Sequence, residues 1–399
     1  MSKKTKFRKA ILLLFGFFLA VIVLQYFFSL KFHFPDVRPF SGHNFYNPYQ
    51  KIKPNQWKKA NFHVHTREWG GLTNGMKTSV KLVDSLYTYL GYDIYSISNY
   101  QKINRDLNKN IAYIPAYEHG YLPTKNHHIV LNASEVSWLD YLLPQTIDNK
   151  QEIINQLHKD TSALIAIAHP LFMESFKPED FKFLNNYDFI EVLNQFRFSI
   201  AHWDSALSTG HATFILADDD GHDLNNIYEI GRCLTFINAP LQKDSILYAL
   251  KSGCAYGADV YMSNNETNEQ KKKVIQQIPY FQKILIERDT LFIRLSEKAK
   301  SFKFIGQHGR IKKIENDKIE SSYALKNNDT YIRTEITLMD KTVLYLNPVF
   351  RYDGKSLPKY EVKINWQKTW FYRISFLFLI TILILARNKI KKNKKSNVQ

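Results

Sequence analysis

The chain has 399 residues, of which 45% are hydrophobic and 15% are aromatic. It is therefore long enough for one large domain and a small one, and it is not a mainly disordered polymer. The formal net charge is +17, but eleven basic residues and no acidic ones lie in the two terminal tails, residues 1–9 and 387–399, so that only +6 remains between them. The basic charge belongs mainly to the tails, and we expect no nucleic-acid partner.

Each tail adjoins an apolar segment. Residues 10–30 and 369–387 resemble transmembrane helices in composition, which makes the lipid bilayer the first expected partner. A cleaved signal peptide is the alternative for the first segment, although its apolar run is long and no small-x-small cleavage site follows it. A buried helix is the alternative for the second. Arg373 near its start is compatible with a span because a long Arg side chain can reach the interface.

The basic tails also predict the orientation. Lys and Arg residues that flank membrane spans tend to stay in the cytoplasm. Residues 1–9 and 388–399 are therefore predicted to be cytoplasmic tails of a protein in the cytoplasmic (inner) membrane. The residues between the two spans, including a juxtamembrane linker at 31–57, are predicted to lie outside the cytoplasm.

Residues 58–260 contain short apolar runs that alternate with helical patterns. Thr78 or Ser79 is a candidate cap for the first helix, and two more helices are predicted at 147–157 and 245–250. Strands that alternate with helices predict an α/β fold, here a closed or nearly closed barrel with its active site at the carboxyl ends of the strands. The seven strand-like runs are residues 62–65, 94–97, 112–115, 129–131, 164–168, 189–193 and 214–217.

The remainder of the chain has a different pattern. Residues 263–274 are polar and charged and predict a linker, and the alternating patterns after it predict a small β-sandwich over residues 275–365. The expected fold is thus an α/β barrel followed by a β-sandwich, with one transmembrane helix at each end. Cys233 and Cys254 are the only cysteines, too few for a cysteine-based zinc site. They either pair in an oxidising compartment or remain two small buried side chains.

Histidines and one glutamate follow or begin several of the strand-like runs. His63 and His65 are two residues apart on a predicted strand, so their imidazoles share a face and can share a metal ion. Glu118 ends one run, and only one of the adjacent His127 and His128 can point inward from the next. A further histidine, at position 169, ends a buried run. Each residue alone has an ordinary explanation, such as a solvated carboxylate or a hydrogen-bonded core histidine.

An acidic cluster, Asp218-Asp219-Asp220-Gly221-His222, follows another apolar run. Three adjacent carboxylates repel one another, and at the end of a buried strand a bound cation relieves that repulsion. A solvated acidic turn is the alternative. Taken together, the ordered series of His, Glu and Asp residues at successive strand ends predicts nitrogen and oxygen ligands suited to zinc, manganese or iron.

The order of these motifs resembles that of the PHP (polymerase and histidinol phosphatase) family. Its members have a distorted seven-stranded α/β barrel and hydrolyse phosphoesters with two or three metal ions. The resemblance covers about residues 58–258, and the β-rich region after it looks like that of the CehA-like subgroup. The matching motifs are His63-Val64-His65, Glu118 ten residues before His128, His169-Pro170 and Asp220-Gly221-His222.

The resemblance implies two divalent metal ions bridged by Glu118. It assigns one set of ligands to His63, His65, Glu118 and Asp220, and the other to Glu118, His128 and His169. The sequence departs from the family at Ser98-Asn99-Tyr100, where members carry Thr-Asp-His. A third metal position, to which His222 would belong, is therefore expected to be empty or weak.

The predicted function is a membrane-anchored, metal-dependent phosphoesterase that uses a metal-bridged hydroxide. Glu118, Asp220 and His222 are the predicted catalytic residues, with His222 free to protonate the leaving group. Arg67 and Arg197 are candidates for phosphate contact because a guanidinium matches phosphate geometry. Two alternatives stay open: a catalytically impaired scaffold or binding module of the cell envelope, and a hydrolase of a non-phosphate bond.

Two residues outside these motifs are candidates for supporting roles. Glu191 and Asn194, at the end of the sixth run, are predicted to orient the metal ligands. No motif selects the substrate, which we expect only to be phosphorylated, and none selects the metal.

Overall fold

Two β-sheets form the body of the protein in the computed structural model, which describes residues 3–73, 75–105, 107, 112–263 and 266–396. The first sheet has the order β10-β8-β7-β6-β5, with β9 beside β8. Its strand β6 is antiparallel to both neighbours, whereas β7, β8 and β10 are mutually parallel. The start of β6 and the ends of the other strands therefore meet at one edge. The strands are β5 (Ala116–His119), β6 (His128–Leu131), β7 (Leu164–Ile167), β8 (Phe189–Asn194), β9 (Arg197–Phe198) and β10 (Phe214–Asp218).

The second sheet has the order β13-β14-β16-β17-β12-β11-β3-β4, with β15 beside β14 and β2 beside β17. It contains strands from the region of the expected barrel and from the region of the expected β-sandwich, and the pairing of β17 with β12 joins the two. The strands are β2 (Asn44–Tyr46), β3 (Trp57–Asn61), β4 (Ile94–Tyr95), β11 (Cys233–Asn238), β12 (Ala255–Asp259), β13 (Phe281–Glu287), β14 (Thr290–Gly306), β15 (Arg310–Ala324), β16 (Tyr331–Thr337) and β17 (Val343–Tyr352).

These sheets bear differently on two expectations about domain structure. The predicted strands of the barrel lie in two sheets, but isolated bridges link them at both edges: Val64, after β3, pairs with Gly221, after β10, and Tyr100, after β4, pairs with Glu118 in β5, which is compatible with the expected distorted, nearly closed barrel. The strands predicted to form a separate β-sandwich instead continue the sheet that contains β3, β11 and β12. Single-sequence patterns identify a strand's faces but not its neighbour, so they could not reveal this pairing.

Helices pack around the sheets, and side-chain caps explain where α2, α3 and α6 begin. Ser79 accepts a hydrogen bond from the Leu82 amide at the start of α2, and Thr146 forms a capping box at the start of α3. Helix α6 begins inside the expected 263–274 linker, where Thr267 forms another capping box that the charged composition obscured, and it ends at Gln276. The helices are α2 (Val80–Leu90), α3 (Ile147–Leu157), α4 (Ile200–Ser208), α5 (Lys243–Lys251) and α6 (Asn268–Gln276).

Two strand boundaries near the predicted ligands also differ from expectation. Strand β3 ends at Asn61, so His63 and His65 follow the strand instead of lying within it. Strand β5 starts at Ala116 and contains Glu118, because Pro115 immediately before it lacks an amide that could donate to a ladder.

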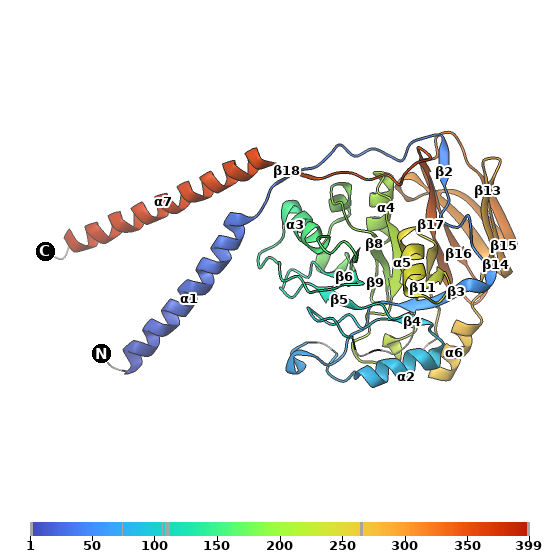
Figure 1. Ribbon diagram of the computed structural model, residues 1–399, viewed down its shortest axis with the longest axis horizontal. Coiled ribbons are helices and arrows are strands. Elements are labelled where there is room, and N and C mark those ends of the chain that lie inside the picture. The colour runs from blue at the N-terminus through green and yellow to red at the C-terminus, as the bar shows by residue number, and fades with distance from the viewer. Residues whose placement is uncertain (1–2, 74, 106, 108–111, 264–265, 397–399) are drawn as a thin grey trace.

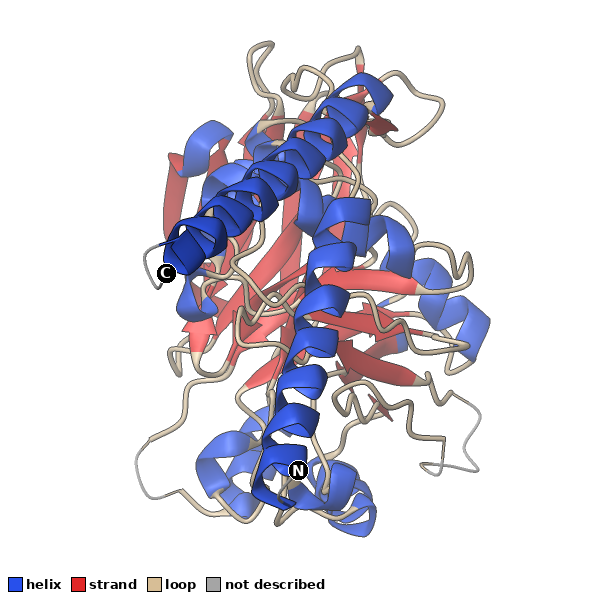
Figure 2. Cartoon of the chain, turned by 90° about the vertical axis from the view of Figure 1, so that its left-hand side faces the viewer, coloured by secondary structure: helices blue, strands red, loops and turns tan. Residues whose placement is uncertain are grey.

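Two long helices leave the same side of the body, α1 (Lys3–Phe28) and α7 (Trp366–Ser396) (Figure 1). The apolar spans Phe7–Phe28 and Trp366–Ile390 have mean hydropathies of 2.6 and 1.9, and by length and composition both are able to cross a membrane. Only 6% of the second span is buried, so the alternative of a buried core helix is wrong. Figure 2 shows both helices as separate rods in front of the sheets.

The segment between α1 and β3 belongs to the fold. Strand β1 (Phe32–His33) pairs with β18 (Lys363–Ile364) just before α7, and β2 pairs with β17. The two chain ends that carry the apolar helices are thereby joined to each other and to the second sheet.

Buried polar side chains connect the two halves of the chain. The side-chain oxygen of Asn347, on β17, accepts a hydrogen bond from the Ile215 amide at 2.8 Å. The side-chain nitrogen of Asn347 donates to the backbone carbonyls of Gly253 and Ala255. Arg333 on β16 makes a two-pronged contact with Asp204 on α4, at 2.7 and 2.8 Å. Both contacts explain why the C-terminal strands are an integral part of the body.

We expect Asn347→Ala to lower the free energy of unfolding by about 2–4 kcal/mol, because it leaves a buried amide and two buried carbonyls without their partner. Thermal or denaturant unfolding of the full chain in detergent measures this change. The exposed Asn316 on β15 is the matched control, and Asn316→Ala should shift the unfolding midpoint little. Equal effects of the two substitutions would contradict the bracing role of Asn347.

Candidate metal centre

Six buried side chains converge where the ends of the strands meet. His63 and His65 follow β3, Glu118 lies in β5, and the others come from the loops at the same edge of the first sheet. All six are at most 7% exposed. They are His63, His65, Glu118, His127, His169 and Asp220.

Four of these side chains enclose a first candidate cation position. The Nε2 atom of His63 lies 3.1 Å from Asp220 Oδ1 and 3.4 Å from Glu118 Oε2. The Nε2 atom of His65 lies 3.1 Å from the same glutamate oxygen and 3.4 Å from the same aspartate oxygen, and the two Nε2 atoms are 3.2 Å apart. A tetrahedral ion with donor distances of about 2.0–2.1 Å holds its donors roughly 3.3–3.4 Å apart. All five separations are close to this spacing.

Glu191 determines which ring nitrogen of His63 carries the proton. Its Nδ1 atom lies 2.8 Å from Glu191 Oε1, and because an ionised carboxylate only accepts, Nδ1 carries the proton. In the neutral ring Nε2 then presents a lone pair to the carboxylate oxygens. The other Glu191 oxygen accepts from the His169 amide at 2.7 Å and from Asn194. Glu191 and Asn194 therefore lie where the sequence analysis expected groups that orient ligands.

Glu118 also faces a second set of donors. Its Oε1 atom lies 2.5 Å from His127 Nδ1 and 3.1 Å from His169 Nε2. Its Oε2 atom faces His63 and His65. One carboxylate thus divides its two oxygens between two nitrogen-rich groups, which is the arrangement of a bridging ligand.

The assignment of His128 is corrected to His127. Successive side chains of a strand point to opposite faces, and His128 points away from Glu118 towards Phe176 and His119, with ring centroids 5.6 and 5.7 Å away. The sequence left the choice open because every residue of β6 is buried, so neither face is marked by polarity.

Unpaired acceptors show that the donor groups fit a cation. Glu118 Oε2 and Asp220 Oδ1 are buried and have no hydrogen-bond partner among the described residues. A buried acceptor without a partner costs about 1–3 kcal/mol, more when it is charged. A divalent ion coordinated by these oxygens and by neutral imidazoles would satisfy both atoms at once.

The charges of the centre are strongly coupled. Burial would raise the pKa of the Glu118 carboxyl, but the imidazoles of His127 and His63 hold it well below its ordinary value. Burial would lower the pKa of His63, but Asp220 and Glu191 raise it well above its ordinary value. The buried carboxylates therefore require positive charge between them, from a proton on an imidazole or from a metal ion.

Two of the converging residues have a strained backbone. His169 has a φ of 26° and Asp220 a φ of 52°, values that residues with a side chain rarely adopt. Such strain persists where the surrounding structure enforces it, and it is common at functional sites.

Only one carboxylate of the acidic cluster faces the centre. Asp218 accepts from the Phe62 amide, and Asp219 accepts from the amides of Gly231, Arg232 and Cys233 as well as from two tyrosine hydroxyls. The expectation that a cation relieves mutual repulsion thus concerns Asp220, because Asp219 is bound by backbone amides and hydroxyls and Asp218 binds the Phe62 amide through one oxygen.

An open cleft of about 620 Å³ leads to the centre. Arg197, Lys125 and His222 line it, whereas Arg67 is exposed and does not. Arg67 thus lies outside the cleft in which it was expected to contact phosphate. The guanidinium of Arg197 stacks over Phe172 at 4.1 Å, which orients it in the cleft.

His222 lies beside the two donor sets and forms a further candidate donor group with His65 and Asp220. Its Nδ1 atom donates to the Asp220 carbonyl at 2.7 Å, so Nε2 is the nitrogen available to a ligand. Burial and the neighbouring His65 lower its pKa. The expected role of His222 as proton donor stays a prediction.

Tyr100 is a site residue that the sequence marked only as a departure from the Thr-Asp-His motif. Its ring stacks on His65, with centroids 4.6 Å apart and planes at 22°, and meets His127 edge-on at 5.4 Å. It lines the part of the cleft beside His65. The motif comparison gave it no role of its own.

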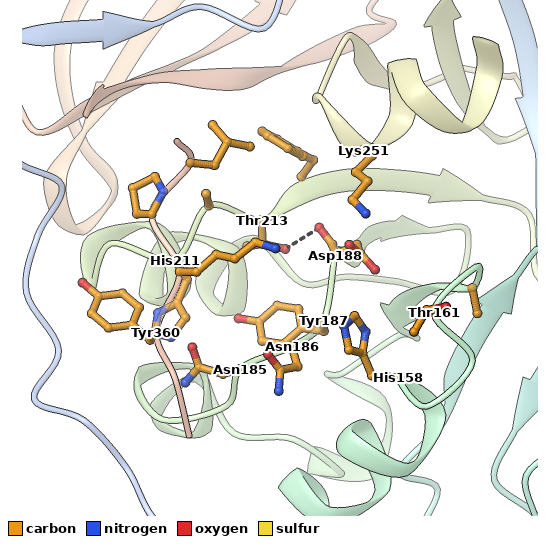
Figure 3. A pocket seen from close by; sticks show the side chains of 16 residues that line it. His158, Thr161, Asn185, Asn186, Tyr187, Asp188, His211, Thr213, Lys251 and Tyr360 are labelled. Carbon is orange, nitrogen blue, oxygen red and sulfur yellow. Dashed lines mark hydrogen bonds between the residues drawn. The ribbon is translucent and has the colours of Figure 1, made fainter. Parts of the chain in front are cut away.

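A second cavity, of about 190 Å³, lies at the amino ends of β7, β8 and β10, opposite the centre (Figure 3). Burial raises the pKa of its Asp188, whose carboxylate accepts from the Ile165 amide. The candidate metal-binding groups of the described residues all lie at the other end of the strands. Cys233 and Cys254 lie outside the centre and are both free thiols.

No protein-family model matches the chain, and no curated protein matches it. A solved two-domain protein from Bacteroides vulgatus ATCC 8482, which contains a predicted PHP-like metal-dependent phosphoesterase, is similar with a TM-score of 0.40 and 13% identity over 80% of this chain and 98% of that one. PsfC from Pseudomonas syringae PB-5123 is similar with a TM-score of 0.35 and 13% identity over 55% of this chain and 96% of that one. At such low TM-scores and identities, neither structure assigns an activity to this chain. Any proposal about its activity therefore rests on the geometry of the donor atoms.

We expect His127→Ala to weaken binding of one metal ion by at least about tenfold, because it removes a nitrogen that faces Glu118. His128→Ala is the matched control, since it removes the adjacent imidazole on the opposite face. The control should retain its metal and lose only thermal stability. Metal content and competition with a chelator, measured on the folded full chain, check both. Loss of metal in His128→Ala but not in His127→Ala would restore the original assignment.

Proposed function

We propose that the protein is a membrane-anchored hydrolase that uses two divalent metal ions to cleave phosphoesters. The observation that supports this most directly is the placement of Glu118, whose two oxygens face separate groups of buried donors. Four histidines, one glutamate and one aspartate form an N/O donor set suited to zinc, manganese or iron.

In this proposal His63, His65, Glu118 and Asp220 hold one ion, and Glu118, His127 and His169 hold the other. Bound divalent ions supply Lewis acidity, which lowers the pKa of water and neutralises charge on a phosphoryl oxygen. Glu191 keeps the His63 lone pair directed inward through its 2.8 Å contact with Nδ1. The protein's own task is to fix these ligands in a dry, rigid frame.

Cleft residues supply the remaining functions. Arg197, already oriented on Phe172, is the group that binds the phosphate of the substrate. Lys125 adds a second positive charge at the cleft, and Tyr100 restricts the space beside His65. Phosphate is favoured over a neutral amide or lactone because two cationic side chains and two metal ions would surround the substrate.

The proposed location is the cytoplasmic membrane, with the catalytic body on the extracytoplasmic side. Two exposed apolar helices support the anchoring, and the contacts of the last turn of α1 with the body favour an uncleaved anchor over a signal peptide. The basic tails support the orientation.

Activity is tested on the full chain in detergent, because β1 and β18 make the ends part of the fold. We expect metal-dependent hydrolysis of a generic phosphomonoester or phosphodiester. Glu118→Gln, which keeps the shape of the side chain but removes its charge, should reduce turnover by at least about a hundredfold, since even outer partners of metal ligands contribute 10–100-fold.

His119→Gln is the matched control for this substitution, because His119 is the next buried residue of β5 and faces away from the cleft, with its Nε2 contacting the Leu139 carbonyl. Bound metal without turnover would support the scaffold alternative. Turnover of an amide or lactone alone would support a different hydrolase. Absence of metal and turnover together would refute the proposed centre.

The orientation is tested with short epitope tags at both termini of the chain in intact spheroplasts. We expect both tags to resist added protease while the body is digested, because the basic tails remain in the cytoplasm. Digestion of either tag before lysis would contradict the proposed topology, and lysed spheroplasts provide the control for accessibility.

A further inference from the structure

Large apolar side chains are exposed on three loops between α1 and the cleft. Leu72 is 92% exposed, Trp138 56% and Leu143 55%. Exposed apolar residues that occur singly are ordinary, but several on adjacent loops mark a surface that is covered in use. We call this surface the apolar rim, and it consists of Trp69, Leu72, Tyr121, Trp138, Leu142 and Leu143.

The rim is attached to the last turns of the apolar helix α1. The Leu143 amide donates to the Tyr26 hydroxyl at 2.7 Å, and Gln25 donates to the Asp140 carbonyl. The rings of Tyr26 and Tyr141 lie 5.3 Å apart. Since residues 25 and 26 belong to the candidate span Phe7–Phe28, the loop that carries Leu142 and Leu143 lies at the depth where that span ends.

Contacts continue from this loop towards the cleft. The Tyr121 hydroxyl donates to the Trp138 carbonyl at 3.1 Å, and their rings are 5.9 Å apart. Trp138 meets the ring of Trp69 at 6.1 Å, and the Trp69 indole donates to the Tyr100 carbonyl at 2.8 Å. Tyr100 lines the cleft and stacks on His65. The rings of Tyr121, Trp138 and Trp69 therefore form a row that reaches Tyr100 through its carbonyl. At the other end, the Tyr121 amide donates to the Asp140 carboxylate, and Gln25 of α1 donates to the Asp140 carbonyl.

The composition of the rim fits a bilayer surface. Trp and Tyr are enriched where a membrane meets water, because their rings are apolar and their N–H and O–H groups are polar. Lys125 also lines the cleft, where it would face anionic head groups, whereas Lys77 is paired with Asp223 at 3.1 Å. A purely apolar protein partner would gain nothing from the charge of Lys125.

We infer that the apolar rim rests on the outer leaflet of the membrane that holds α1, and that the substrate is a lipid-linked phosphoester whose head group enters the cleft from the bilayer. This inference rests on the proposed function for its chemistry. In the reaction, water adds across the P–O bond: its oxygen bonds to phosphorus and its proton goes to the leaving oxygen. The lipid product stays in the membrane when the ester joins phosphate to the lipid.

The position of the rim is tested without activity. Leu143→Cys in a Cys254→Ser background carries a fluorescent label, because Cys233 is buried. The labelled full-length chain is placed in nanodiscs whose lipids bear a quencher on the acyl chain. We expect at least twofold stronger quenching at position 143 than at Ile314→Cys, an exposed site on β15, a strand that lies on the far side of the body from α1 (Figure 1). Equal quenching at both positions would overturn the inference, and would mean that the rim contacts a protein partner or water instead of lipid.

The substrate class is tested in nanodiscs with diacylglycerol phosphate and, as its soluble counterpart, glycerol phosphate. The double variant Leu142→Ser, Leu143→Ser should lower turnover of the lipid at least tenfold and change turnover of the soluble ester less than twofold. The matched control Ile311→Ser, Ile314→Ser should change neither. The phosphodiester pair phosphatidylglycerol and glycerophosphoglycerol is measured in the same way.

The outcomes separate the inference from the proposed function. Turnover of the soluble ester without preference for the lipid, or with no effect of the rim variant, overturns the inference and retains the proposed function. No turnover of either ester refutes the proposed function, while the quenching experiment still decides whether the rim lies on the membrane.

Discussion

The structure of the candidate site depends on one buried carboxylate that is shared between two groups of imidazoles. Glu118 is fully buried, so its negative charge requires compensation that water cannot supply. His63 and His65 face one of its oxygens, and His127 and His169 face the other. Because these residues come from three separate loops and one strand, the requirement for charge compensation at Glu118 draws the ends of the strands to one place.

The body around this centre is braced by strands from the far end of the chain. The C-terminal strands extend the sheet that carries β3, and buried groups such as Asn347 fix them against β10 and β12. The same strands lead through β18 to α7, while β1 leads from α1. Support of the candidate metal ligands and attachment to the apolar helices thus come from one continuous framework, which in the proposed membrane-anchored hydrolase would hold the cleft at a defined height above the bilayer.

The proposed function at a membrane would also explain features that an isolated soluble enzyme would not need. Exposed Trp and Leu side chains on surface loops would favour aggregation in water. Placed beside the end of α1, they would instead be covered by lipid, and the aromatic row from Trp138 to Tyr100 would connect that surface to the metal centre. Tyr100, which departs from the motif of the PHP family, stands at the inner end of this row.

The sequence by itself determined the apolar end segments, the capped helices α2 and α3, and the residues His63, His65, Glu118, His169 and Asp220, which do lie together. These follow from local patterns: length of an apolar run, cap residues, and polar groups at the ends of buried runs. Only the tertiary structure decided that His127 rather than His128 faces Glu118, that Asp218 and Asp219 bind backbone amides instead of joining the donor groups, and that the expected β-sandwich continues another sheet. Those outcomes depend on which strand lies beside which and on which face each side chain takes. In fully buried strands, polarity marks neither the neighbour nor the face.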